Sequence, residues 1–295
     1  MYMEIIVGKT AGFCFGVKRA VEGSIKEANK TDNQIYCLGE LVHNKEVVKM
    51  IEDKGIITID NIDEIQQKQV KMIIRAHGID KKIYTDAKKR NIEVIDYTCP
   101  LVSKIHTIAK EHQDKGYYIF YVGSRIHPET IGTISHCGNN YAIIENEEDI
   151  NQAICALQQS KINNLLVIVQ TTYSKKKFEI IEKIIKEKIP SKTNIIIKNT
   201  ICKTTEQRQQ ETEEISKKVE LMIVIGGKNS SNTKKIYEIA EKNTEAILIE
   251  TEKELNVEAV KKYNKIGIMA GASTPIDIIN RVIKKTKWLK QVLNA

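Results

Sequence analysis

Three widely spaced cysteines each lie where a short apolar run gives way to an amphipathic stretch. They are Cys14, Cys99 and Cys202, and Pro100, a favoured first helical residue, follows the second of them. The pattern predicts that each thiol lies at a helix N-terminus. Such a position favours the thiolate, which is the form that ligates metals. We therefore expect the three cysteines to share one metal centre.

The spacing of these cysteines favours an iron–sulfur cluster over zinc. It lacks the C-x₂₋₄-C pairs typical of structural zinc sites and the compact C-x₂-C-x₂-C run of ferredoxin-type carriers. A cubane held by only three protein thiolates leaves one iron open to bind a substrate oxygen. The alternative is an ordinary packing role as small hydrophobes, which we expect for Cys37, Cys137 and Cys155.

Three histidines end separate strand-like runs. They are His43, His77 and His127. A histidine in such a place is often a hydrogen-bonded structural residue, but three in equivalent places predict a shared binding site. Glu129 lies two residues after His127. A closed cavity would raise the pKa of Glu129 and allow it to act as a proton donor. The alternative is that Glu129 caps a helix. Thr171 and Thr172 are candidates to orient a substrate hydroxyl, to relay a proton, or to cap the next helix.

Two glycine-rich turns predict a phosphate site. One carries Ser230, Ser231 and Asn232, and the other ends at Ser273. Backbone amides and hydroxyls at such turns can cradle phosphate oxygens, although the same residues are also ordinary turn chemistry. With the three histidines they suit a diphosphate bound without a metal ion. A nucleotide is disfavoured because the chain has neither a P-loop nor a clean G-x-G-x-x-G motif.

Short β-branched runs alternate with amphipathic stretches, which predicts parallel sheets covered by helices. A loose repeat of about 95 residues divides the chain into thirds, each opening with a strand that leads to a cysteine. We expect three similar α/β domains of residues 1–96, 97–193 and 194–295, the last with a C-terminal helix. The expected strands are 4–7, 34–38, 55–59 and 70–74 in the first third, 92–95, 117–122, 141–144 and 165–169 in the second, and 194–197, 221–225, 246–249 and 265–269 in the last.

All candidate residues follow strand ends, where parallel sheets bind ligands. We therefore expect the three domains to pack as a cloverleaf, with pseudo-three-fold symmetry, around one central cluster. The apolar runs are of strand length, the N-terminus carries no signal-peptide pattern, and the cysteines form no compact disulfide framework. These features predict a cytoplasmic protein with no membrane partner.

The chain carries a net charge of +8, and its lysines are spread along the predicted helices. Only 5% of its residues are aromatic, which weakens a nucleic-acid interpretation based on stacked bases. Solvated helix faces therefore explain most of the charge, and we expect no nucleic-acid partner. His106 and His112 are expected at the surface.

The motifs resemble those of the LytB family, the 4-hydroxy-3-methylbut-2-enyl diphosphate reductases, over essentially the whole chain. They occur in the family's order: Gly12-Phe-Cys14, Arg75-Ala-His-Gly78, Thr98-Cys-Pro-Leu-Val102, His127-Pro-Glu129, Gln170-Thr-Thr172, Thr200-Ile-Cys202, Lys228-Asn-Ser-Ser-Asn232 and Ala270-Gly-Ala-Ser273. The resemblance implies one [4Fe-4S] cluster on Cys14, Cys99 and Cys202, with an open iron that binds the substrate hydroxyl.

The same resemblance implies roles for the polar residues. The diphosphate-binding set would be His43, His77, His127, Ser230, Ser231, Asn232 and Ser273. Glu129 would deliver protons, with Thr171 or Thr172 assisting and His127 beside it. A ferredoxin or flavodoxin-type donor would supply two electrons, and isopentenyl and dimethylallyl diphosphate would form in the non-mevalonate route to isoprenoid precursors. Two alternatives stay open: a non-redox iron–sulfur dehydratase and a basic RNA-binding protein.

Overall fold

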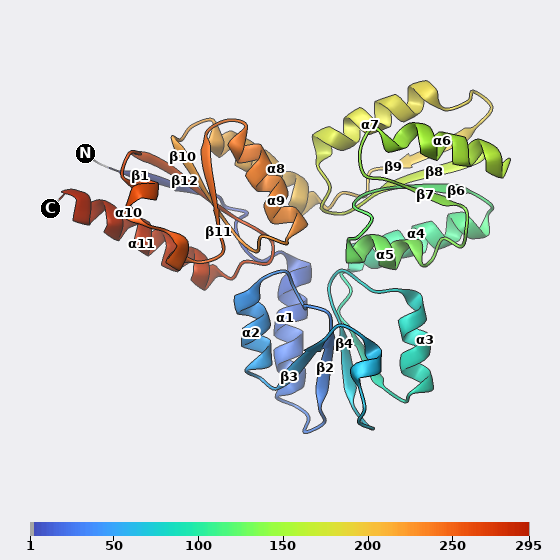
Figure 1. The fold of residues 1–295 in the computed structure, drawn as a ribbon, viewed down its shortest axis with the longest axis horizontal. Coiled ribbons are helices and arrows are strands. Elements are labelled where there is room, and N and C mark those ends of the chain that lie inside the picture. The colour runs from blue at the N-terminus through green and yellow to red at the C-terminus, as the bar shows by residue number, and fades with distance from the viewer. Residues whose placement is uncertain (1–2, 295) are drawn as a thin grey trace. The chain divides into compact units, whose positions relative to one another are not determined.

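The computed structural model describes residues 3–294, and its helices and strands alternate along the chain (Figure 1). The strands among these residues form three four-stranded sheets in which all neighbouring strands are parallel, so the expected α/β class is confirmed. The strand order in one sheet is β3 (Ile56–Ile59), β2 (Ile35–Leu38), β4 (Lys71–Ile74) and β5 (Glu93–Asp96). In a second sheet it is β7 (Tyr141–Ile144), β6 (Tyr118–Val122), β8 (Asn164–Val169) and β9 (Asn194–Lys198). In the third it is β1 (Glu4–Val7), β12 (Lys265–Ala270), β10 (Leu221–Ile225) and β11 (Glu245–Ile249).

Helices cover the faces of these sheets. Their bounds are α1 (Phe15–Ala28), α2 (Lys45–Glu52), α3 (Lys81–Lys89), α4 (Pro100–Asp114), α5 (Pro128–Ile134), α6 (Asp149–Ser160), α7 (Lys175–Lys188), α8 (Lys203–Ser216), α9 (Ser231–Glu241), α10 (Val257–Val260) and α11 (Ile276–Asn294), with 3₁₀ turns η1 (Ile62–Glu64) and η2 (Glu252–Glu254). In the β7-β6-β8-β9 sheet, α6 and α7 cover one face and α4 and α5 the other (Figure 1). Central strands such as β6 and β10 are wholly buried because both of their faces are covered.

Side chains alternate between the two faces of each strand, and this alternation positions one residue of interest. Phe120 of β6 packs in the core shared with α6 and α7. The next residue, Tyr121, packs in the opposite core, on the side of α4 and α5. Its hydroxyl is therefore directed toward the elements that carry Glu129.

Strand pairing differs from the sequence expectation at the strands that lead to the cysteines. β5 pairs with β4 and β9 with β8, so each of these strands joins the last strand of the preceding third, whereas β1 pairs with β12, the last strand of the last third. The expectation that such a strand opens the sheet of its own third is wrong. Backbone hydrogen bonds are alike for all strands, so chain order does not decide which edges meet.

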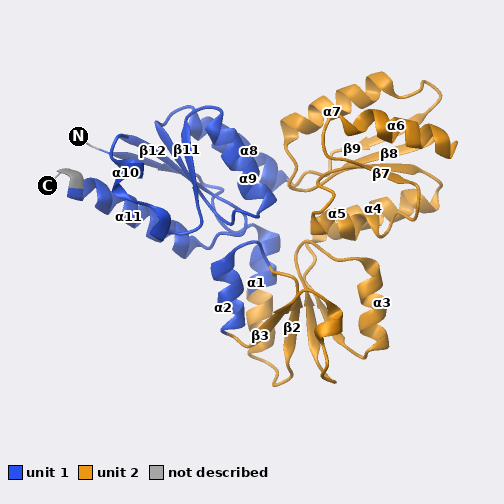
Figure 2. Cartoon of the chain, in the orientation of Figure 1, with its two compact units in different colours: residues 1–21, 42–53, 203–295 blue, residues 22–41, 54–202 orange. Residues whose placement is uncertain are grey.

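The chain separates into two compact units (Figure 2). The first comprises the described part of residues 1–21, 42–53 and 203–295, and it contains the β1-β12-β10-β11 sheet. The second comprises residues 22–41 and 54–202, and it contains the other two sheets. Independent domains with the limits 1–96, 97–193 and 194–295 stay a prediction. Two strands pair across these limits, because β1 joins β12 and β9 joins β8. Among the described residues, no helix combines the length and hydropathy needed to cross a membrane.

Candidate active site

Glu129 is a buried acid at the start of α5. His127 is the N-cap of this helix, and its Nδ1 accepts the backbone N–H of Glu129 at 3.1 Å. This cap and Pro128 in the first turn fix the direction in which the Glu129 side chain leaves the helix. The side chain is only 1% exposed. The carboxyl group is therefore held inside the second unit.

Three donors contact the Glu129 carboxyl group. The backbone N–H of Thr171 donates to Oε1 at 2.7 Å, and the Thr171 hydroxyl donates to Oε2 at 2.5 Å. The Tyr121 hydroxyl donates to Oε1 at 3.3 Å. Burial raises the pKa of Glu129 to about 6, although hydrogen bonds from Thr171 and Tyr121 act in the opposite direction. A carboxyl group with this pKa can exchange protons near neutral pH.

The two candidate threonines have different partners. Thr171 contacts Glu129 through both its backbone and its side chain. The Thr172 hydroxyl instead accepts a hydrogen bond from Nε2 of Gln170 at 2.9 Å. Oε1 of the same glutamine accepts the backbone N–H of Ser124 at 3.1 Å, which ties the two loops together. The geometry thus identifies Thr171 as the partner of the acid.

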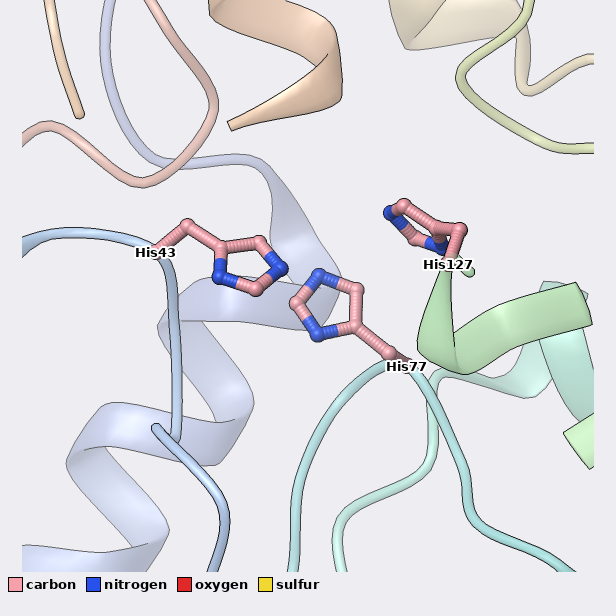
Figure 3. Close-up of side chains that lie close together, drawn as sticks. All are labelled: His43, His77 and His127. Atoms are coloured by element: carbon pink, nitrogen blue, oxygen red, sulfur yellow. The ribbon is translucent and has the colours of Figure 1, made fainter. Parts of the chain in front are cut away.

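His77 and His127 lie together in the second unit. Their rings meet edge to face, with centroids 5.4 Å apart and an interplanar angle of 88° (Figure 3). His77 follows β4 and His127 follows β6, so two strand ends bring these rings together. Two imidazoles at one place provide weakly basic donors for an anionic ligand.

The first unit gathers another part of the predicted set. The Ser273 hydroxyl donates to the backbone carbonyl of His43 at 3.2 Å. A Cβ added at Gly227 would lie 2.2 Å from the same carbonyl oxygen, so only glycine permits this close approach. Ser230 caps α9 by accepting the backbone N–H of Thr233 at 3.3 Å. Both glycine-rich turns therefore lie beside the His43 loop, and Ser231 begins α9.

Asn232 has an unusual environment for an amide. Its side chain is buried, with the residue only 4% exposed, yet neither its amide nitrogen nor its amide oxygen has a hydrogen-bond partner among residues 3–294. An unpartnered buried amide costs free energy unless a ligand satisfies it. This group sits in the first turn of α9, whose N-terminus is suited to phosphate.

The three candidate cysteines occupy equivalent local positions. Cys14 directly precedes α1, Cys99 is the N-cap of α4, and Cys202 directly precedes α8, as expected. Each backbone N–H donates to a carbonyl in the polar loop after the adjacent strand. The three acceptors are Ala272 for Cys14 at 3.3 Å, Ala76 for Cys99 at 3.0 Å and Thr171 for Cys202 at 3.0 Å. All three are free cysteines, and each residue is partly exposed.

The other three cysteines have different surroundings. Cys37 and Cys137 are buried, and burial raises the pKa of each thiol to about 12, which suits the packing role expected for them. Cys155 is exposed on α6, so the expectation of a packing role is wrong there. Its position in the helix points outward, whereas Ile154 points into the core.

Sequence reasoning missed Tyr121 as part of this site. Its strand, Tyr118–Val122, has three aromatic residues, and all five residues are buried. The period of two along a strand would have placed Tyr121 on one face, but nothing local indicates that Glu129 lies opposite it. Only the packing of α5 against β6 reveals the contact.

A family model described as LytB protein matches residues 5–287. The chain belongs to the LytB family. Two relatives named 4-hydroxy-3-methylbut-2-enyl diphosphate reductase support the assignment. The one from Clostridioides difficile is 41% identical over 95% of this chain and 98% of its own. The one from Thermoanaerobacter sp. is 42% identical over 98% of both chains.

Solved structures of LytB reductases resemble the chain as well. One, described as the terminal enzyme of the non-mevalonate pathway, is 33% identical, with a TM-score of 0.70 over 97% of this chain and 99% of its own. The reductase from Plasmodium falciparum is 31% identical, with a TM-score of 0.87 over 96% of this chain and 88% of its own. The LytB fold is thus shared along nearly the whole chain.

Membership of the LytB family implies an iron–sulfur enzyme. The donor set of this chain fits such a group, because three partly exposed thiols stand at helix N-termini while the two buried thiols are protonated at neutral pH. A backbone hydrogen bond from Cys202 to Thr171 also links one of these cysteines to the residue that contacts the buried acid.

Proposed function

We propose that the chain converts 4-hydroxy-3-methylbut-2-enyl diphosphate to isopentenyl and dimethylallyl diphosphate in the non-mevalonate route. The reaction breaks the C–O bond of the allylic hydroxyl, consumes two electrons and two protons, and releases water. A new C–H bond forms at one of the two ends of the allyl unit. The named relatives and the chemistry of the site support this reaction.

One observation carries the proposal. Thr171 joins the acid to a cysteine, because its hydroxyl donates to Glu129 while its carbonyl accepts the backbone N–H of Cys202. A proton donor is thereby linked, through one residue, to a cysteine that directly precedes a helix. A reductive dehydroxylation needs both a proton source and a metal ligand at one place.

Cys14, Cys99 and Cys202 would hold one [4Fe-4S] cluster, leaving one iron without a protein ligand. When bound, the cluster supplies low-potential electrons and a Lewis-acidic iron for the substrate hydroxyl. A ferredoxin or flavodoxin-type protein would be the electron donor, and the net charge of +8 favours an acidic partner. We also propose a cytoplasmic location, where a reducing environment preserves the thiols.

Glu129 would deliver protons through Thr171. Oε1 of the carboxyl group already accepts two donors, so the transferable proton belongs on Oε2, which faces the Thr171 hydroxyl. That hydroxyl would pass the proton toward the substrate. His127 would help to orient the acid, because its ring accepts the Glu129 backbone N–H.

The diphosphate would be bound by neutral and weakly basic donors. The amide of Asn232 is the clearest of them, since its side chain is buried without a hydrogen-bond partner in the described part of the chain. The remaining proposed donors are His43, His77, His127, Ser230, Ser231 and Ser273. Helix α9 adds the partial positive charge of its N-terminus.

Anaerobic reconstitution with iron and sulfide tests the function directly. We expect the loaded protein to turn over the diphosphate only when a low-potential reductant is present, with both isomeric products found by mass spectrometry. Loss of water without any reductant would instead favour the dehydratase. Salt-dependent RNA binding that persists without iron would favour a nucleic-acid role.

A substitution tests the acid itself. In Glu129→Gln, we expect normal iron content but turnover reduced by at least about 100-fold, because a general acid typically contributes 10²–10⁴-fold to a rate. Glu147→Gln is the matched control, since Glu147 is exposed on the same unit. Near-normal turnover in Glu129→Gln would remove this residue from the mechanism.

A further inference from the structure

The loop that carries Cys14 has little regular structure of its own. Six residues separate the end of β1 from the cysteine, and Gly12 within them has a φ of +102°. A loop of this kind samples many conformations unless other residues hold it. The thiol at its end can be placed reproducibly only if the backbone before it is fixed.

Glu211 of α8 binds the first part of this loop. Its Oε1 accepts the backbone N–H of Lys9 at 2.7 Å. Its Oε2 accepts both the backbone N–H of Thr10, at 2.8 Å, and the Thr10 hydroxyl, at 2.6 Å. Burial raises the pKa of Glu211, but these hydrogen bonds outweigh it, so the pKa lies below the ordinary value and the group is ionised at neutral pH.

Arg208 binds the second part of the loop from the same face of α8. Its Nε and Nη2 donate to the Thr10 carbonyl at 2.9 and 2.6 Å, and Nη2 also donates to the Gly12 carbonyl at 2.8 Å. The side chain is only 2% exposed and is the largest of the fully buried side chains. Burying a guanidinium group costs free energy unless hydrogen bonds compensate for it. Arg208 makes such bonds to two carbonyls of the loop, which indicates a specific role for this side chain.

We propose that Arg208 and Glu211 are positioning residues for Cys14. They lie three positions apart on α8 and together bind both the amides and the carbonyls of residues 9–12, so the loop has one conformation before any iron arrives. Helix α8 begins directly after Cys202, so a single helix follows one cysteine ligand and holds the loop of another. This inference rests on the iron–sulfur part of the proposed function.

We call Arg208 and Glu211, with the loop of residues 9–12 that they bind, the clamp. Two substitutions separate an effect on the position of Cys14 from an effect on general stability. Arg208→Lys keeps the charge but loses the planar fork that reaches two carbonyls. Glu211→Gln replaces one acceptor by an amide donor that faces other donors. Glu214→Gln is the matched control, because Glu214 is exposed on the same helix and its carboxylate accepts a hydrogen bond from Gln210, one turn away on that helix.

The readouts use the full chain before and after reconstitution. In the metal-free protein, we expect both variants to exchange the Lys9 and Thr10 amides about tenfold faster and to expose Cys14 to faster alkylation by iodoacetamide. Alkylation of Cys99 should stay unchanged, and Glu214→Gln should match the wild type. After reconstitution, the electron paramagnetic resonance spectrum of the reduced cluster should change in both clamp variants.

The outcomes distinguish a positioning role from a structural one. A lower melting temperature with wild-type Cys14 alkylation and a wild-type spectrum would overturn the proposal. If the clamp variants do not fold, Thr10→Val can replace them, because it removes only the hydrogen bond from the Thr10 hydroxyl to Glu211. It should give smaller changes in the same direction. Wild-type exchange and alkylation rates in Thr10→Val would also overturn the proposal. Faster alkylation in a protein that never turns over would contradict the proposed function but support the clamp.

Discussion

The Glu129 carboxyl group has two unequal oxygens. Oε1 accepts from the Thr171 amide and the Tyr121 hydroxyl, whereas Oε2 accepts, among the residues that the structure describes, only from the Thr171 hydroxyl. This inequality directs a proton to the oxygen that faces Thr171. Since burial raises the pKa of Glu129 to about 6, the strength of these bonds decides how much of the acid is protonated near neutral pH.

Tyr121→Phe tests this control of the acid. The substitution removes a donor that favours the carboxylate, so the pKa of Glu129 should rise further above its ordinary value. Because Glu129 acts as an acid, kcat/KM should fall as pH rises through its pKa in the free enzyme. We expect that alkaline limb, near pH 6 in the wild type, to move upward by about half a pH unit in the variant.

Tyr118→Phe controls for the loss of a phenol from the same strand, since the Tyr118 hydroxyl donates to the Tyr141 carbonyl instead. Its pH profile should match the wild type. A limb that stays in place or moves downward in Tyr121→Phe would mean that Tyr121 does not regulate the acid.

At the scale of elements, one local arrangement occurs three times. A strand leads to a cysteine, a helix begins there, and the cysteine amide bonds to the loop after the adjacent strand. The three loops carry His77, Thr171 and Ser273, close to the accepting carbonyls of Ala76, Thr171 and Ala272. Parallel pairing therefore couples each predicted metal ligand to a predicted polar residue, which the order of motifs along the chain does not reveal.

Helix α4 carries two histidines that sequence reasoning misjudged, and one of them contacts His136 in the turn after α5. His106 was expected at the surface, but its ring stacks on His136 with centroids 4.9 Å apart, and its Nε2 is buried with no hydrogen-bond partner among the described residues. His112 is also buried, with its Nδ1 2.7 Å from the Ile108 carbonyl. Both expectations fail because amphipathic periodicity does not show that a second helix packs on this face.

The environment of His106 predicts that the free energy of unfolding depends on pH in the acidic range. Burial and the neighbouring His136 lower the pKa of His106 to about 4, while Asp96 acts in the opposite direction. In the unfolded chain His106 binds a proton below about pH 6.5, whereas in the native protein it does so only below about pH 4. The free energy of unfolding therefore falls as the pH decreases between these two values. We expect His106 to contribute a loss of about 2 kcal/mol to the free energy of urea unfolding between pH 7.5 and pH 4.5, while the raised pKa of Glu129 acts in the opposite direction over part of this range.

In His106→Gln this part of the pH dependence should disappear, because glutamine does not titrate. The comparison is the difference in unfolding free energy between the two pH values for each protein. Equal differences in the variant and the wild type would show that His106 does not carry the effect.

At the scale of the whole molecule, the first strand completes the last sheet. β1 pairs with β12 at its edge, and Ile5 packs against the core formed with α10 and α11. Ile5→Asp places a carboxylate there, which we expect to destabilise the first unit by about 2–4 kcal/mol. Hydrogen exchange should accelerate in β10 and β12, more than 200 residues away, while β6 and β8 keep their protection.

Ile57→Asp is the control, because Ile57 is 43% exposed on β3. It should leave exchange in all three sheets near the wild-type level. If Ile5→Asp instead exposed β2 and β4, the first strand would belong with the first third, contrary to the observed register.

Much of the local structure follows from the sequence. All twelve expected strands are present with ends within one residue of the observed ones, because apolar runs of strand length between amphipathic stretches have few other solutions. The positions of Cys14, Cys99 and Cys202 before helices were also predictable, since Pro100 and the flanking periodicity are local signals. The order of these motifs was sufficient to indicate the family.

The folded chain was needed to learn which strands pair, which threonine contacts Glu129, and in which direction burial shifts the pKa values of Glu129 and His106. It alone placed Arg208 and Glu211 on a loop about 200 residues away in the chain. The physical reason is that backbone hydrogen bonds, desolvation and side-chain contacts act through space. The sequence records local preferences, but not which distant groups share one environment.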